Sequence, residues 1–350
     1  MKIKELTLTG TPFERGLQYG AECREEIRRS MQSYELLFGR KGISWEAAKE
    51  RATRFIAVIE ETDPRYVEEM KGIAQGAGVA FLDVLAINCR SELLYAPAPQ
   101  ECTAFSLIPP ATADGMVWAG QSWDYIRSQR EALVILRIPA EENRPSLLLF
   151  AEAGMIGGKG MNSAGLALTL NALSTQESGF GLPLHVRMRR ILEQDSLQKG
   201  YEVAVQGGHP SPVNWILTHR DGHALGLEVQ CNGVDLLEPR NGAIFHTNHF
   251  VGPKFGVNIN SGGSYLRQQR IQQLLGGRSD VTLEEIKAAL ADHANAPSSI
   301  CKHTTAEDEA EAMKQHATNH TLIMDLLAGE AHFSLGNSCE GEYRLLKTEG

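Results

Sequence analysis

The stretch PAPQECTAFSL (residues 97–107) separates two parts of the chain that differ in character. Its prolines and polar residues disfavour a continued helix or strand. The TAFSL that follows Cys102 contains residue types that are common in strands. We therefore predict an exposed, bendable segment that leads directly into a strand, with Cys102 at the start of that strand.

The residues before this junction are predicted to be mainly helical. Apolar side chains recur there at the spacing of one helix face: Cys23, Ile27, Met31 and Tyr34. Asp63 is a typical helix cap, and Pro64 follows it at a first-turn position. Residues 80–95 are expected to form a further helix with an apolar face.

The residues after the junction are β-rich, with the strand-like runs TAFSLI, MVWAGQSWDY, ALVILRI, SLLLFAEAG and GLALTLNAL. Asp-Gly at 114–115 and 221–222 and Asn-Gly at 241–242 lie between such runs and favour hairpin turns. A last hairpin is expected to turn near 328–329. These features predict antiparallel meanders.

Three helices are predicted within this β-rich part, at 183–194, 264–276 and 282–292. The third opens with the capping-box spacing of Thr282 and Glu285. The order of helices, many antiparallel strands, central helices and more strands predicts an α+β fold in which helices cover sheets in layers.

The composition is that of a globular protein with one large domain or two smaller ones: 350 residues, 42% hydrophobic and 22% charged. A net charge of −9 and the lack of a dense Lys/Arg block argue against nucleic acid as a partner. The N-terminus MKIKELTLTGTPFERG lacks the pattern of a signal peptide. No stretch approaches the roughly 18 apolar residues of a membrane span. We therefore expect a cytoplasmic protein with no membrane partner.

The cysteines do not have the short, regular spacing of a disulfide framework or of a zinc site with paired cysteines. They are Cys23, Cys89, Cys102, Cys231, Cys301 and Cys339. Cys301 and His303 could pair as nucleophile and base, but we expect them in a surface loop, because closeness in sequence does not itself activate a thiol.

Two further motifs do not support a cofactor or a metal. The glycine-rich GMIGGKGMNS lacks the spacing of a phosphate-binding loop, since Gly160 follows Lys159 where Ser or Thr is required. His246 and His249 are three residues apart on a predicted strand, so their side chains would point to opposite faces. We expect no cofactor and no metal.

Cys102 is the best candidate for chemistry. If the bond between Glu101 and Cys102 were cut, one residue would carry both a thiol and a free α-amino group. The reference pKa of an α-amino group is about 7.7–8.0, and that of a thiol is about 8.5. The amino group could therefore serve as the base that activates the thiol.

Three polar residues near strand ends could assist Cys102. Asp124 in GQSWDY could hold the amino group, and Asn171 in LTLNALS could donate to a developing oxyanion. Asn248 in HTNHF could act likewise. Each alone is more often a turn former, so their occurrence in one β-rich region carries the prediction.

Several motifs together resemble a known family. ECTAFSL, GQSWDY, GKGMNSAGLALTLNALS, HTNHF, GSYLRQQR and the early GTPFERGLQYG are similar to the acyl-coenzyme A:6-aminopenicillanic acid acyltransferases, a family of N-terminal-nucleophile (Ntn) hydrolases. A more distant similarity extends to choloylglycine hydrolases and penicillin V acylases. The resemblance runs through most of the chain.

The resemblance implies a four-layer αββα sandwich and self-cleavage between Glu101 and Cys102. Residues 1–101 would form a small retained chain, and residues 102–350 the catalytic one. Cys102 would be the nucleophile and Asp124 would bind its amino group. The family places oxyanion or substrate-positioning amides at the positions of Asn171 and Asn248.

The resemblance also implies an arginine near the nucleophile, for which Arg267 or Arg270 is available; we favour Arg267. At Gln121 the chain departs from the choloylglycine hydrolases, which carry an arginine three residues before the aspartate. That departure favours the acyltransferase branch and leaves the source of positive charge near the thiolate open. Gln121, Trp123 and Tyr125 are candidate substrate-binding residues, although aromatic residues in strands more often belong to the core.

The predicted function is cleavage of a small-molecule acyl amide or acyl thioester through an acyl-enzyme on Cys102, with transfer of the acyl group to water or an amine. One alternative is a strict amidohydrolase that never transfers the acyl group. Another is a non-catalytic binding protein in which Cys102 is a small buried residue. The assembly expected for an active enzyme is the processed heterodimer, alone or as a homo-oligomer.

Overall fold

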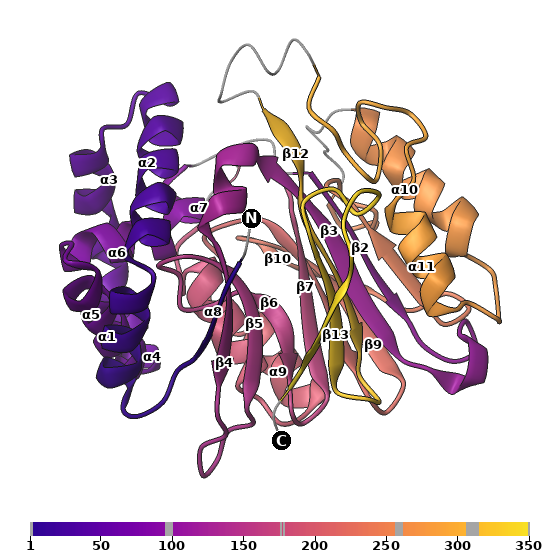
Figure 1. The fold of residues 1–350 in the computed structure, drawn as a ribbon, viewed down its shortest axis with the longest axis horizontal. Coiled ribbons are helices and arrows are strands. Elements are labelled where there is room, and N and C mark those ends of the chain that lie inside the picture. The colour runs from indigo at the N-terminus through magenta and orange to yellow at the C-terminus, as the bar shows by residue number, and fades with distance from the viewer. Residues whose placement is uncertain are drawn as a thin grey trace.

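A computed structural model of the protein describes residues 3–94, 101–175, 177, 179–255, 262–305 and 315–348. The proline-bearing part of the predicted junction, at 97–100, lies outside the described residues. The described chain forms two stacked β-sheets with helices on their outer faces, beside a group of N-terminal helices (Figure 1).

The N-terminal helices follow the predicted pattern. They are α1 (Pro12–Glu22), α2 (Arg24–Arg40), α3 (Trp45–Ala52), α4 (Ile56–Thr62), α5 (Pro64–Ala77), α6 (Phe81–Asn88) and α7 (Arg90–Leu93). Asp63 caps α5 by accepting a hydrogen bond from the backbone N–H of Arg65, as predicted. The single helix expected over 80–95 is instead broken at Cys89 into α6 and α7.

Helices α1 and α5 cross at very short range because both carry glycines four residues apart at the crossing. A Cβ on Gly16 would lie 2.1 Å from the Glu69 carbonyl oxygen, and one on Gly72 would lie 2.2 Å from that of Phe13. Any larger side chain would push the two backbones apart. Gly20 and Gly76 repeat the contact one turn along.

The first sheet has the strand order β1-β4-β5-β6-β7-β8-β9-β10. Its strands are β1 (Lys4–Thr7), β4 (Leu133–Ile138), β5 (Leu147–Glu152), β6 (Lys159–Asn162), β7 (Leu166–Ala172), β8 (Val213–His219), β9 (His223–Gln230) and β10 (Gly233–Leu237). Strand β1 was not predicted, and it pairs parallel with β4. The N-terminal segment therefore supplies an edge strand to this sheet as well as helices.

The second sheet has the strand order β11-β2-β3-β12-β13-β14. Its strands are β11 (Ala243–His246), β2 (Glu101–Leu107), β3 (Trp118–Ile126), β12 (His316–Asp325), β13 (Glu330–Leu335) and β14 (Arg344–Lys347). The hairpin turns predicted near 114–115, 221–222 and 328–329 are confirmed. The hairpin predicted at 241–242 is wrong, because β10 pairs with β9 in the first sheet whereas β11 pairs with β2 in the second.

The helices cover the outer faces of both sheets. Helices α8 (Leu184–Leu192) and α9 (Leu197–Val205) contact β7 and β8, and β7 in turn contacts β2 and β3 of the second sheet. Helices α10 (Gly262–Leu275) and α11 (Leu283–Leu290) lie on the other side of the second sheet (Figure 1). This is the expected αββα order, and α9 is a helix that was not predicted.

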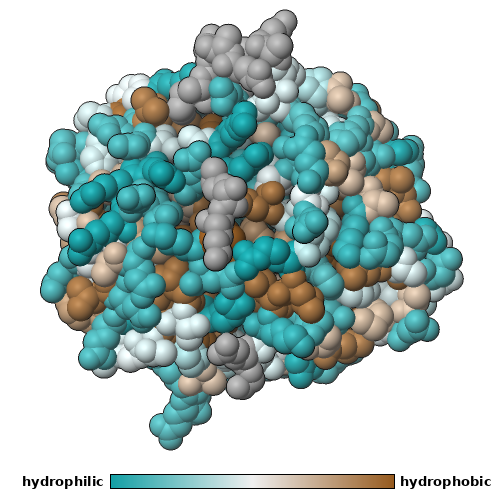
Figure 2. Space-filling model, viewed as in Figure 1, coloured by the Kyte–Doolittle hydropathy of each residue, from teal (hydrophilic) through white to brown (hydrophobic). Residues whose placement is uncertain are grey.

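The side of the molecule seen in Figure 2 is mostly hydrophilic, with small separated apolar patches. Within the described ranges, no helix has both the length and the apolar character that crossing a membrane would require.

Candidate active site

The register of the second sheet places three buried side chains in a row across neighbouring strands. Cys102 on β2 pairs with Trp123 on β3, and Trp123 pairs with His320 on β12. Residues directly opposite one another project from the same face of a sheet. The side chains of this row belong to the core between the two sheets.

Lys159, at the start of β6 in the opposite sheet, reaches this row. Its Nζ lies 3.3 Å from His320 Nε2 and 4.4 Å from the centre of the Trp123 ring. Burial raises the pKa of the Cys102 thiol to about 12, and Lys159 is the strongest charge that acts in the other direction. Burial also lowers the pKa of Lys159 to about 8. The ammonium is therefore the main local charge that favours a Cys102 thiolate.

Sequence reasoning missed Lys159, because GMIGGKGMNS lacks the spacing of a phosphate-binding loop and the overlapping family-like motif GKGMNSAGLALTLNALS pointed only to Asn171. Its rejection as such a loop is confirmed, since Lys159 begins a strand and no helix follows it directly. The usable signal was a lone lysine within a run of small and apolar residues, which predicts a buried charge. Gln121, which lies three residues before Asp124 and carries no charge, accepts a hydrogen bond of 2.8 Å from the Leu170 N–H.

The opposite face of β2 and β3 carries the carboxylates. Glu101 pairs with Asp124 in the strand register. Asp124 is fully buried, and its Oδ1 accepts a hydrogen bond of 2.6 Å from Thr318 Oγ1. Its Oδ2 has no hydrogen-bond partner among the described residues. Burial raises the pKa of Asp124 to about 7, against the opposing attraction of Arg267.

Arg267 on α10 is the arginine that lies beside Cys102. Its guanidinium donates to the Cys102 carbonyl oxygen at 2.6 Å and to Asn248 Oδ1 at 3.1 Å, and it lies 3.6 Å from Glu101 Oε2. Arg270, the other arginine considered, donates two hydrogen bonds to Asp292 instead. This ion pair is partly exposed and joins α10 to the residues that follow α11.

Asn248 connects Cys102 to the first sheet. Its Oδ1 accepts a hydrogen bond of 2.8 Å from the Cys102 N–H, and its Nδ2 donates to the Ala172 carbonyl oxygen at 3.0 Å. With the chain intact, the backbone N–H of Cys102 is thus held by Asn248. Together with Arg267, this amide fixes both polar groups of the Cys102 backbone.

Asn171 lies next to Ala172 on β7 and has a free donor. Its Oδ1 accepts a hydrogen bond of 3.1 Å from Asn214 Nδ2. Its own Nδ2 is buried and makes no hydrogen bond to any described residue. A buried NH₂ group without a hydrogen-bond acceptor costs free energy of folding. An oxyanion formed during catalysis would be a suitable acceptor.

A small pocket lies between the sheets, and Trp123, Lys159 and His320 are among its lining residues. A second pocket shares Leu170 with it. Tyr125, the third substrate-binding candidate, packs its ring 5.3 Å from that of Trp123. Neither Tyr125 nor Gln121 lines either pocket.

The two histidines examined as metal ligands make other contacts. His246 Nε2 lies 2.8 Å from Glu228 Oε1, whereas His249 stacks on Tyr265 with 3.9 Å between ring centres. The expectation of a surface loop at Cys301 is wrong, because Cys301 is fully buried beside Cys339.

The chain is similar to known proteins in sequence and in structure. The chain is 31% identical, over 342 residues, to the acyl-coenzyme A:6-aminopenicillanic-acid-acyltransferase 40 kDa form of Emericella nidulans, covering 95% of this chain and 92% of the relative. Among solved structures, a mutant of the conjugated bile acid hydrolase from Clostridium perfringens has a TM-score of 0.46 and 14% identity, covering 71% of this chain and 97% of that chain. Penicillin V acylase from Agrobacterium tumefaciens has a TM-score of 0.45 and 12% identity, covering 70% and 86%.

The family-level match runs from β3 to β13 and includes strands of both sheets and helices α8 to α11. Residues 111–339 match the family described as acyl-coenzyme A:6-aminopenicillanic acid acyl-transferase. Together with the relative that aligns over nearly the whole chain, this match shows that the protein belongs to the acyl-coenzyme A:6-aminopenicillanic acid acyltransferase family.

Proposed function

We propose that the protein cuts its own chain between Glu101 and Cys102 and then transfers acyl groups through Cys102. The acyl donor is a small-molecule amide or thioester, and the acceptor is water or an amine. The observation that carries this proposal is the environment of Cys102. Its backbone N–H and carbonyl are held by Asn248 and Arg267, while its side chain belongs to the core between the sheets, beside Trp123 and Lys159.

In the first reaction, the Cys102 sulfur attacks the carbonyl carbon of Glu101. The C–N bond breaks, the nitrogen takes up a proton, and a thioester joins Glu101 to the Cys102 side chain. Water then hydrolyses this thioester, which releases the Glu101 carboxylate, the thiol and a free α-amino group on Cys102. The net reaction consumes one water molecule.

The environment of Asp124 supports this step. The buried Oδ2 of Asp124 has no partner among the described residues of the intact chain. The α-amino group that cleavage frees on Cys102 could donate a hydrogen bond to this oxygen, because Asp124 is the cross-strand partner of Glu101. Cleavage would then give a buried carboxylate oxygen the donor that it lacks among the described residues of the intact chain.

In turnover, the free α-amino group accepts the thiol proton and the Lys159 ammonium favours the resulting thiolate. The thiolate attacks the acyl carbonyl, and Asn171 Nδ2 donates a hydrogen bond to the oxyanion. The leaving amine or thiol departs with a proton, and water or an amine then attacks the acyl-enzyme. The pocket beside Trp123 would receive the acyl group.

The contacts of residues 1–101 explain how two chains would stay together after the cut. Arg90 forms a buried ion pair with Glu152 at 2.8 Å, and Glu69 forms another with Arg189 at 3.2 Å. Strand β1 is also part of the first sheet. Removing one partner of a buried pair is strongly destabilising, so the small chain would be retained as a subunit.

Mass spectrometry of the purified protein tests the proposal. Wild type should give two chains that divide after Glu101, Cys102→Ala should remain one chain, and Cys102→Ser should cut slowly. Cys231→Ala, at an exposed cysteine, is the matched control and should be cut like wild type. An intact wild-type chain that is active on acyl amides would refute self-cleavage.

Partition of the acyl group distinguishes an acyltransferase from a strict hydrolase, because both use the same acyl-enzyme. The processed enzyme is incubated with an acyl amide or acyl thioester and increasing concentrations of an amine. Formation of the new amide at the expense of the free acid indicates transfer. Selective labelling of Cys102 by an electrophile near neutral pH would argue against a non-catalytic binding protein.

A further inference from the structure

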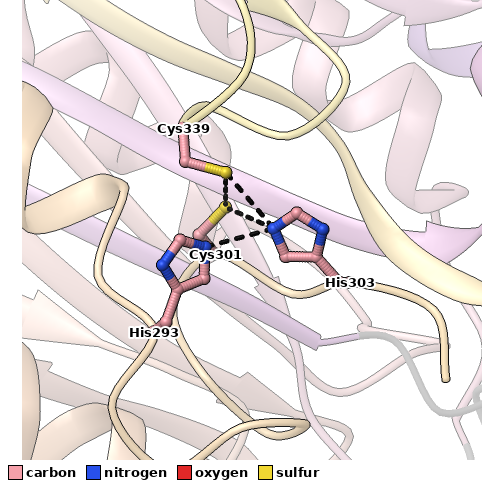
Figure 3. A group of neighbouring side chains, drawn as sticks. All are labelled: His293, Cys301, His303 and Cys339. Atoms are coloured by element: carbon pink, nitrogen blue, oxygen red, sulfur yellow. Dashed lines mark hydrogen bonds between the residues drawn. The ribbon is translucent and has the colours of Figure 1, made fainter.

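Two cysteines and two histidines from distant parts of the chain meet on the side of the second sheet that carries α10 and α11. His293, Cys301 and His303 lie in the connection from α11 to β12, and Cys339 follows β13. One ligand atom of each residue lies within 4.8 Å of all the others. Figure 3 shows the four side chains pointing toward one another.

The distances among these atoms are those of a tetrahedral zinc site. Zinc binds sulfur at about 2.3 Å and imidazole nitrogen at about 2.0–2.1 Å, so tetrahedral ligands lie about 3.8 Å apart for two sulfurs, about 3.6 Å for sulfur and nitrogen and about 3.3 Å for two nitrogens. The Sγ atoms of Cys301 and Cys339 are 3.6 Å apart. His303 Nε2 lies 3.8 Å and 3.2 Å from these two sulfurs and 3.1 Å from His293 Nε2.

Hydrogen bonds alone do not account for this arrangement. His303 Nε2 has three neighbours within these distances: the two sulfurs and the other histidine nitrogen. A ring nitrogen either donates one hydrogen or accepts through one lone pair, so it can satisfy at most one of them well. A single cation between the four atoms would satisfy all of them at once.

The surroundings provide the outer contacts that metal ligands usually have. Asn337 Nδ2 donates toward Cys301 Sγ at 3.8 Å. The other ring nitrogen of His303, Nδ1, lies 3.6 Å from a carboxylate oxygen of Glu340. Such a carboxylate favours the tautomer that presents Nε2 to a metal.

We propose that His293, Cys301, His303 and Cys339 bind one Zn²⁺ as a structural site. Binding forms two Zn–S and two Zn–N bonds and releases the two thiol protons to solvent. With four protein ligands, the ion has no open position for a substrate. The cysteines were set aside in the sequence because the ligands do not form a short motif and Cys339 lies far along the chain from the other three.

A bound zinc ion would hold residues 301–303 in place, and these residues support the cleavage junction. This consequence rests on the proposed function. Lys302, between two of the ligands, places its Nζ 2.8 Å from Glu101 Oε1. Its backbone N–H donates to Thr318 Oγ1 at 2.8 Å, and that hydroxyl donates to Asp124 Oδ1 at 2.6 Å. Fixing Cys301 and His303 therefore restrains the hydrogen bonds that position Asp124.

Metal analysis of the full chain tests the site in a Cys102→Ala background. This background removes the Cys102 thiol and any dependence on processing, so the result is separate from that for the proposed function. We expect one zinc per chain after purification without chelator. After metal removal, added Co²⁺ should give the visible absorption of a tetrahedral thiolate complex, and Zn²⁺ should displace it.

Variants of exposed ligands keep the folded core intact. Cys339→Ser and His293→Gln should each weaken Co²⁺ binding at least tenfold, and Cys339→Ser should also lower the sulfur-to-metal absorption. Cys231→Ser, at an exposed cysteine away from the cluster, should match the parent chain. A parent chain that binds neither ion at micromolar concentration, or binding equal to the parent in Cys339→Ser, would overturn the site, as would a Cys301–Cys339 disulfide in protein purified under reducing conditions.

Discussion

The buried carboxyl of Asp124 should make the uncut protein less stable as pH rises, and this effect can be isolated by substitution. The perturbation is Asp124→Asn, introduced into the Cys102→Ala chain so that no cleavage occurs. The amide keeps the acceptor for Thr318 Oγ1, which lies 2.6 Å from Oδ1. It removes the negative charge of a buried carboxyl group whose Oδ2 has no hydrogen-bond partner in the described part of the chain.

The magnitude follows from the pKa of this group. Burial raises the Asp124 pKa from 3.8 to about 7, which corresponds to about 4 kcal/mol against the ionised form. Between these values the folded chain binds more protons than the unfolded chain, so the free energy of unfolding falls as pH rises. Between pH 4 and pH 7 the loss from this single group amounts to about 3 kcal/mol.

The assay is denaturant unfolding of both chains across that pH range. The stability of Asp124→Asn relative to its parent should increase by about 3 kcal/mol from pH 4 to pH 7. Other titrating groups, such as His209 and His249 with their lowered pKa values, cancel because they are common to both chains. Asp114→Asn, at an exposed residue in the connection between β2 and β3, is the control and should keep a constant difference. A constant difference for Asp124→Asn as well would refute the reasoning.

Three other substitutions test separate parts of the structure. Asn171→Ala should lower the rate of acyl-enzyme formation by about 10²–10³ while circular dichroism shows an intact fold, and an unchanged rate would exclude it as an oxyanion donor. Lys159→Met should shift the pH dependence of Cys102 alkylation to higher pH, because an ammonium that favours the thiolate is lost; peptide mass spectrometry follows the alkylation. Lys199→Met, at an exposed lysine, should have no effect. Alkylation profiles of Lys159→Met and wild type that superimpose would contradict the assignment. Gly72→Ala should cost about 1–3 kcal/mol of stability, since its Cβ would lie 2.2 Å from a backbone oxygen. Gly39→Ala on α2, with nothing within 4 Å, should be neutral or stabilising by up to about 1 kcal/mol; equal effects in thermal unfolding would argue against close packing of α1 on α5.

Features that depend on a few neighbouring residues were predictable from the sequence. The Asp63 cap with Pro64, the Asp-Gly turns and the capping box at Thr282 all form as expected. Each is decided by hydrogen bonds and backbone preferences within about four residues. The same signals do not say which sheet a strand joins. Asn-Gly at 241–242 therefore predicts a hairpin, whereas the turn connects two sheets.

Only part of the candidate site could be predicted from the sequence. The positions of Cys102, Asp124, Asn171 and Asn248 near strand ends predict them as site residues, and the family resemblance adds Arg267. The structure brings Asn248 and Arg267 onto the Cys102 backbone. The spacing along the chain could not show that Asn248 holds the Cys102 N–H, or that Thr318 donates to Asp124. These contacts depend on how two sheets stack.

The sequence by itself determined the α+β class, the local turns and caps, and the cysteine around which the proposed chemistry is built. Only the tertiary structure decided that Lys159 lies against Trp123 and His320, in the same row of side chains as Cys102. It also decided that the four zinc-site residues come together: His293, Cys301, His303 and Cys339. The physical reason is the range of the interactions. Helix caps and turns are governed by neighbours in the chain, whereas the position of a buried charge or of a four-ligand cluster is set by sheet packing between residues up to 161 positions apart.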